Sequence, residues 1–176
     1  MTALATGDVD ALDALAATAP RVSLAIHIRG DGAQLWLSAD AGPSTPAQRL
    51  SAVAPAAVVQ RVLAWAIRHA ASVMVALDRS ISAPDFGDRA RAVLDTLGAT
   101  PTRVVVIPGD PQSERGEPAE YGQPGVALEL ATAGGHPLTA TLVQGVVPAD
   151  DCPAVTADYA RRAQALADAL GVTCQR

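Results

Sequence analysis

Two aspartates lie just beyond the ends of predicted strands and could support metal or acid–base chemistry. Asp78 follows the apolar run Ser72–Leu77, and Asp110 lies just beyond the run Arg103–Ile107. Open α/β sheets bind ligands at the carboxyl ends of their parallel strands, and two carboxylates there could hold Mg²⁺ or act as a general acid and base. One hypothesis is therefore a Mg²⁺-dependent hydrolase or transferase that uses Asp78 and Asp110.

The same two aspartates also fit an ordinary structural role. Aspartate is common where a strand passes into a turn, and Asp110 precedes Pro111 in a typical turn setting. The metal site requires the two strands to be neighbours, because both carboxylates must converge within about 4–6 Å of a shared ion position. The places of the two strands in the sheet therefore discriminate between the two interpretations.

A second set of candidate residues comes from a predicted N-terminal hairpin. Residues 21–29 alternate in polarity, and residues 34–38 follow after Gly30-Asp31-Gly32. A two-residue turn at 31–32 predicts that the numbers of paired residues sum to 63, which places Ile28 opposite Leu35. The apolar face of the first strand then consists of Val22, Leu24, Ile26 and Ile28.

On the opposite face of this hairpin, the predicted register places Arg29 opposite Gln34 and His27 opposite Trp36. A cation, an amide, an imidazole and an indole on one rigid ribbon are typical of binding hot spots. These four residues are the predicted ligand- or partner-binding site. The alternative is that they are cross-strand pairs that cover a solvated face or pack beneath a helix.

Residues 108–125 are predicted to form a long acidic loop. This segment contains four prolines and four glycines without periodicity, and all four glutamates of the chain lie between positions 114 and 129. Loops of this length are usually functional or disordered. A mobile solvated loop, a lid over the aspartate site and an acidic docking segment for a basic partner all remain open.

Composition excludes several mechanisms. The chain contains neither lysine nor asparagine, so it has no Schiff-base lysine, no P-loop lysine and no N-glycosylation site. Motifs of dinucleotide-binding proteins, α/β-hydrolases, zinc peptidases and dithiol redox proteins are absent. Three scattered histidines and two distant cysteines offer no zinc-ligand spacing, so we expect no cofactor other than the Mg²⁺ of the enzyme hypothesis. The residue bias is typical of a high-GC bacterial genome.

The net charge and the spacing of the cysteines limit which classes of partner and which cellular compartment are expected. A net charge of −5 argues against nucleic acid as a partner. The longest uncharged run, 130–149, contains adjacent glycines and two prolines, which indicates a hairpin and not a membrane span. Cys152 and Cys174 flank a predicted helix and should lie roughly 25 Å apart, too far for a disulfide. We therefore expect two unpaired thiols and a cytoplasmic protein.

The predicted elements give one α/β domain over residues 1–176, with no internal repeat. It contains a mixed sheet of about six strands, covered by helices. The sheet combines the N-terminal hairpin, a central parallel βαβ unit and a C-terminal hairpin around Gly134-Gly135. The βαβ unit consists of strands 72–77 and 103–107, expected to be adjacent, and a helix at 86–97. After a loop at 41–46 we expect a helical stretch that includes Pro55, and a last helix runs from near Asp151 to Gly171.

The leading functional hypothesis is a non-catalytic accessory or adaptor module that binds a protein or a small ligand through the His27, Arg29, Gln34 and Trp36 face. The enzyme that uses Asp78 and Asp110 is the first alternative. The second is a structural subunit of a homo-oligomer that pairs through an exposed edge of the 126–147 hairpin. No membrane partner is expected.

Overall fold

The fold is a single α/β domain built on one mixed sheet. A computed structural model describes residues 13, 17, 21–29, 32–40, 48–69, 72–77, 86–109 and 120–176. Eight strands form the sheet in the order β10-β5-β7-β8-β4-β1-β2-β3. Their bounds are β1 Arg21–Arg29, β2 Gly32–Asp40, β3 Gln48–Ala54, β4 Ser72–Leu77, β5 Thr100–Ile107, β7 Gly125–Ala131, β8 Pro137–Gln144 and β10 Thr173–Gln175. Two further short strands, β6 (Tyr121–Gly122) and β9 (Val147–Pro148), pair with each other.

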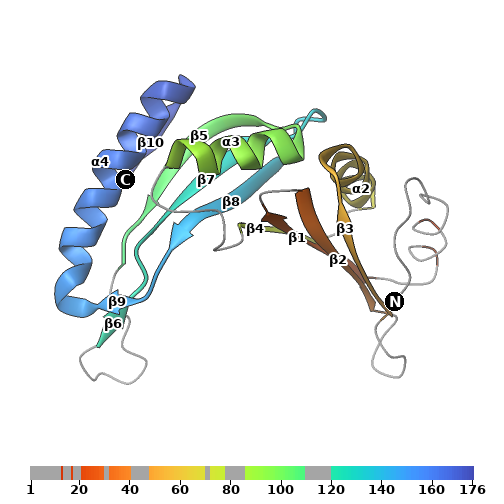
Figure 1. Cartoon of the computed structure of the whole chain (residues 1–176), viewed down its shortest axis with the longest axis horizontal. Helices are drawn as coiled ribbons and strands as arrows, with labels where there is room; N and C mark the ends of the chain where they lie inside the picture. Colours follow the sequence, from red (N-terminus) through yellow and green to blue (C-terminus); the bar gives the residue numbers. More distant parts are fainter. Residues whose placement is uncertain are drawn as a thin grey trace.

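The helices of the described residues all lie on one side of this sheet (Figure 1). They are α2 (Ala56–Arg68), α3 (Phe86–Leu97) and α4 (Cys152–Leu170), the last preceded by the 3₁₀ turn η1 (Ala149–Asp151). Helix α4 contacts β5, β10 and β7, α3 contacts β1 and β8, and α2 contacts β1, β2, β3 and β4. The fold class predicted from the sequence is confirmed, and the sheet has two more strands than the expected six.

A single hydrophobic core lies between the sheet and this helix layer. It joins Leu24, Ile26 and Ile28 of β1 to Val59, Leu63 and Trp65 of α2 and to Leu128 and Leu130 of β7. Along β1, β2, β5 and β8, buried side chains alternate with less buried side chains on the other face, as the pleat requires. The helices cover one face only, so the second face of the sheet is open to solvent among the described residues.

The sheet consists of two halves with the same topology. In the first half, β1, β2 and β3 form an antiparallel meander, α2 follows, and β4 returns to pair in parallel with β1. In the second half, β5, β7 and β8 form the meander, α4 follows, and β10 pairs in parallel with β5. A helix, α3, precedes β5, and the helical residues Asp13 and Ala17 precede β1.

The halves meet where β4 pairs in parallel with β8, through only two residue pairs, Val75–Ala140 and Ala76–Thr141. We call this contact the joint. The expectation that the chain has no internal repeat is therefore wrong at the level of topology. The repetition lies in the order and direction of the strands, which different side chains with the same alternation can specify.

Strand β3 corrects the expectation of a helical stretch before Pro55. A helix that continued through Pro55 would lose a backbone hydrogen bond, and the residue before proline disfavours the helical region. The helix therefore begins at Ala56, directly after Pro55. The preceding segment, Gln48–Ala54, pairs antiparallel with β2 instead.

The strands of the predicted βαβ unit, β4 and β5, are not adjacent. They run in the same direction, but the β7–β8 hairpin lies between them. This insertion also places the hairpin in the interior of the sheet, with β5 on one side and β4 on the other. The exposed hairpin edge on which the homo-oligomer hypothesis depended is therefore absent. None of the helices in the described ranges is long and apolar enough to cross a membrane.

Candidate functional site

The four residues of the predicted binding site share the sheet face that carries no helix. Leu24, Ile26 and Ile28 are buried beneath the helices, so the residues that alternate with them point to the opposite face. His27, Gln34 and Trp36 are half-buried on that face, and Arg29 is exposed. The alternation in the sequence thus places all four side chains as expected.

The register of the hairpin differs from the prediction by two residues. Arg29 pairs with Gly32 and His27 with Gln34, so paired residue numbers sum to 61 and not 63. The strands are therefore joined through residues 30 and 31, which lie outside the described residues, and not through 31 and 32. A shift of two keeps every side chain on its predicted face, because side chains alternate with a period of two.

His27 and Trp36 touch in spite of this register difference. Trp36 lies opposite Ala25 and is thus the diagonal neighbour of His27. Diagonal neighbours are within reach of aromatic side chains. The two ring centroids are 4.4 Å apart and the ring planes meet at 87°, a T-shaped contact. The predicted pairing is wrong, but the predicted contact is present.

Two exposed apolar residues extend this surface beyond the hairpin. Met74 of β4 lies beside Ala25 and is 58% exposed, and Val53 of β3 lies beside Gln34 and is 63% exposed. Sequence reasoning missed both, because it took residues 48–54 as helical and did not pair β4 with β1. We call the resulting surface the open-face patch. Its members are Ala25, His27, Arg29, Gln34, Trp36, Val53 and Met74.

The members of the open-face patch are of types common in recognition surfaces. They carry an indole, an imidazole, a thioether, an amide and a guanidinium. Aromatic, methionine and arginine side chains are the types enriched at protein interfaces.

The strand adjacency expected for a metal site at Asp78 and Asp110 is absent. Both aspartates lie outside the described residues. The strands that precede them, β4 and β5, are separated by β7 and β8. Three strand spacings, about 14 Å, separate β4 from β5. Residues 110–119 of the acidic loop, and with them most of its length, also lie outside the described residues.

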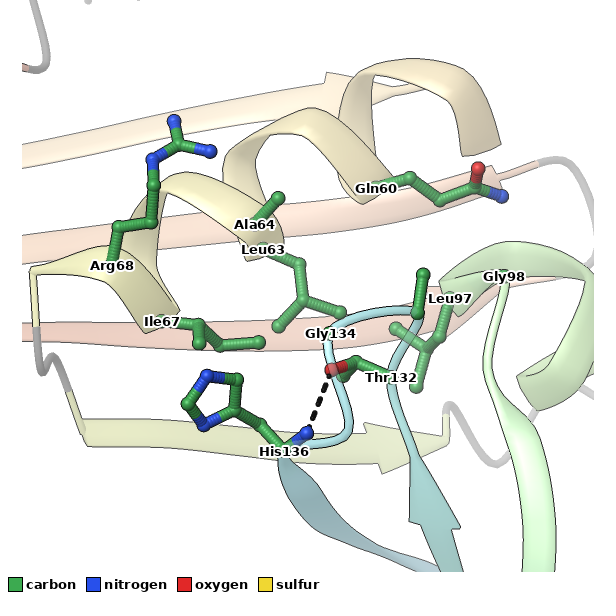
Figure 2. Close-up of a pocket in the computed structure, with 11 residues that line it drawn as sticks. Gln60, Leu63, Ala64, Ile67, Arg68, Leu97, Gly98, Thr132, Gly134 and His136 are labelled. Atoms are coloured by element: carbon green, nitrogen blue, oxygen red, sulfur yellow. Dashed lines mark hydrogen bonds between the residues drawn. The ribbon is translucent and has the colours of Figure 1, made fainter.

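A cavity of about 260 Å³ lies at the boundary between the two halves of the sheet. We call it the joint pocket. One wall is α2, with Leu63, Ala64 and Ile67, and the other wall comes from the end of α3 and the turn between β7 and β8 (Figure 2). The remaining lining residues are Gln60, Arg68, Leu97, Gly98, Thr132, Ala133, Gly134 and His136.

The two ends of the joint pocket differ in chemistry. At one end, Gln60 donates a 3.2 Å hydrogen bond to the carbonyl of Asp95 near the end of α3. At the other end lie Ile67 and His136, and Arg68 stands on the same turn of α2 (Figure 2). His136 donates its backbone N–H to the Thr132 hydroxyl at 3.2 Å, which holds the β7–β8 turn in place.

A second cavity, of about 450 Å³, lies between the end of β5 and the start of α4, with Pro108, Cys152 and Arg176 in its lining. Cys152 is 3% exposed. A Cβ on Gly122 would meet its sulfur and the carbonyl of Gly109, so the thiol is held by close backbone packing. Both cysteines are unpaired, as predicted.

The remaining charged groups have structural roles. Arg103 of β5 holds Glu129 of β7 through two contacts of 2.7 and 2.9 Å, so Glu129 is paired within the sheet and does not mark an edge. Burial lowers the pKa of the Arg89 guanidinium, and the nearby Tyr159 opposes this shift. In the described part of the chain, no group of three histidine, cysteine or acidic side chains gathers to hold a metal ion.

No protein-family model matches the chain, and no curated protein or solved structure is significantly similar to it.

Proposed function

We propose that this chain is a non-catalytic accessory or adaptor module and that its open-face patch docks a partner protein. The observation that carries this proposal is the exposure of Met74 and Val53, 58% and 63%, on the two strands that flank the strands of His27 and Trp36, on a sheet face that no helix of the described residues covers. Contiguous exposed apolar surface of this kind marks interaction sites.

The extent of the patch favours a protein over a small molecule. Its members belong to four neighbouring strands, β4, β1, β2 and β3, which together span about 14 Å across the sheet. The two cavities described above are lined by other residues. A broad surface centred on an indole, with a flexible thioether beside it, suits a complementary protein surface.

The contact between His27 and Trp36 preorganises the Trp36 side chain for binding. The T-shaped packing restricts the indole before any partner arrives, so less side-chain entropy is lost on association. Arg29, exposed at the end of β1, adds a charged group at the rim of the patch, where charge governs association rate and partner choice. The two unpaired cysteines fit a reducing compartment, and we propose a cytoplasmic location.

Affinity capture with a matched aromatic control tests this function. Trp36→Ala removes the indole at the centre of the patch, whereas Tyr121→Ala removes another ring, 57% exposed and located on β6 outside the main sheet. Immobilised wild type and both variants are incubated with lysate of the source organism, and bound proteins are quantified by mass spectrometry.

The proposal expects a defined set of proteins to be retained by wild type and Tyr121→Ala and depleted at least tenfold by Trp36→Ala, a difference of about 1.4 kcal/mol. Circular dichroism checks that both variants remain folded. Capture that does not depend on Trp36 would contradict the proposal. Capture of the same chain would identify the partner as a second copy and make the module a homo-oligomer.

A further inference from the structure

We propose that the joint pocket binds a small organic carboxylate with an apolar body. This site is separate from the open-face patch and does not depend on its function. Ligand pockets occur preferentially where two structural units meet. The joint pocket lies at such a boundary, because α2 belongs to the first half of the sheet, whereas α3 and the β7–β8 turn belong to the second.

The wall of the joint pocket is apolar. Leu63 and Ile67 project from α2 toward the β7–β8 turn, and Leu97 faces them from the end of α3 (Figure 2). The volume, about 260 Å³, lies near the lower end of the range of small-molecule sites. An apolar body of a few carbon atoms would therefore replace water against these three side chains, which is favourable.

The lining of the pocket contains a cation, Arg68, and no carboxylate. None of its 11 lining residues is acidic, although the chain as a whole carries 18 acidic residues and a net charge of −5. Arg68 makes no ion pair with a carboxylate of the described residues. The backbone N–H groups of Ala133 and Gly134 likewise donate to no acceptor in the described ranges.

These donors fix the orientation of the ligand. The negative end of the α3 dipole lies at Gly98, and Gln60 covers it by donating to the Asp95 carbonyl. An anionic group is therefore disfavoured at that end. The opposite end carries the exposed Arg68, whose charge offsets the negative end of the α2 dipole, because α2 ends at this residue. Arginine matches the planar, two-oxygen geometry of a carboxylate. In Figure 2 the Arg68 side chain is directed away from His136 and the β7–β8 turn, so the proposal requires this exposed side chain to turn toward the carboxylate, while the apolar body extends toward Leu97.

Ligand binding in the joint pocket should also stabilise the contact between the two halves of the sheet. The strands contribute only two residue pairs to the joint, Val75–Ala140 and Ala76–Thr141. A ligand held between α2 and the β7–β8 turn adds contacts across the same boundary. Amide hydrogen exchange in β4 and β8 should therefore slow when the pocket is occupied, because local opening there now requires release of the ligand.

The test uses hexanoate and hexanol as matched probes in an NMR titration of the ¹⁵N-labelled chain. The proposal predicts that hexanoate shifts the amide signals of Gly98, Gly134 and His136 with a dissociation constant on the order of 1 mM, and that hexanol binds about tenfold more weakly. Absence of shifts at these residues would overturn the proposal. Equal affinity for both probes would show an apolar cavity without the proposed recognition of an anion.

Two arginines of α2 provide the matched variants. Arg68→Gln should weaken hexanoate binding about tenfold and leave hexanol binding unchanged. Arg61→Gln removes the same charge from an exposed position of the same helix that does not line the pocket, and affinity should change less than twofold. Equal losses in the two variants would mean that net charge, and not contact with Arg68, governs the affinity.

A second pair of variants tests the location of the site. Ala64 is exposed and lines the joint pocket, so Ala64→Phe should block it without disturbing the core. Ala57→Phe places the same ring on an exposed position of α2 outside the pocket lining. Hexanoate binding should be lost only in Ala64→Phe. Unchanged binding in that variant would place the ligand elsewhere and contradict the proposal.

Discussion

The indole N–H of Trp65 donates a 2.7 Å hydrogen bond to the carboxylate of Asp13, a residue that precedes the first strand. Trp65 is fully buried on α2, and this bond satisfies its only polar atom. The carboxylate also lies 3.4 Å from Nε2 of His69. A helical residue upstream of the sheet is thereby attached to the end of α2.

Removal of this acceptor should destabilise the protein. Asp13→Ala leaves the buried indole N–H without a partner and should lower the free energy of unfolding by about 1–3 kcal/mol in urea denaturation. Asp13→Asn keeps an oxygen acceptor and removes the charge, so it should retain most of the stability. Equal destabilisation by both variants would assign the effect to the charge and its contact with His69.

The ion pair between Arg103 and Glu129 should contribute modestly to stability. The pair links neighbouring strands at the surface of the sheet, and both side chains are partly exposed. Glu129→Gln should therefore cost about 0.5–1 kcal/mol, less at high salt. Glu120→Gln, at an exposed position without an ion pair among the described residues, is the control. A cost that does not change with salt concentration would argue against an electrostatic origin.

Gly98 should not tolerate a side chain. Its φ of +59° is in the left-handed region, and a Cβ there would lie 2.8 Å from the side chain of Gln60. Gly98→Ala should lower the free energy of unfolding by about 1–2 kcal/mol, mostly from backbone strain. Gly145→Ala, where a Cβ meets nothing within 4 Å, should change it by less than about 1 kcal/mol. Similar costs at both sites would refute the argument from conformation.

The joint should be the least protected part of the sheet interior. Strands β1 and β2 pair through nine residues, whereas β4 and β8 pair through two. Native-state hydrogen exchange should therefore show earlier opening between β4 and β8 than between β1 and β2. Uniform protection across the sheet would mean that the helix layer, and not the strand ladder, holds the halves together.

Local sequence patterns predicted most elements but not their arrangement. The alternation in β1 reports which face of that strand is buried, and this prediction holds. The order of the strands depends on which elements meet after the chain has turned back. Nothing in residues 72–77 indicates that they pair with β1 and β8 and not with β5. Because local patterns do not encode strand order, the sequence also did not reveal that the two halves of the sheet share one topology.

The sequence predicted the part of the candidate site that depends on local alternation, and it missed the part that depends on strand pairing. His27, Arg29, Gln34 and Trp36 share a face because alternation survives a register shift of two. Val53 could have been placed with them, since Pro55 stops a helix from extending backward and residues 48–54 can then form a strand. Met74 became part of the patch only through the pairing of β4 with β1.

The most direct test of the open-face patch compares two equally exposed valines. Val53 lies in the patch and is 63% exposed, and Val146, between β8 and β9, is 66% exposed. Val53→Asp and Val146→Asp add the same charge, and quantitative affinity capture of the partner retained by wild type measures both. The account predicts at least a tenfold loss of that partner for Val53→Asp, about 1.4 kcal/mol, and less than a twofold change for Val146→Asp. Equal retention by the two variants would contradict the assignment of the open-face patch as the docking surface.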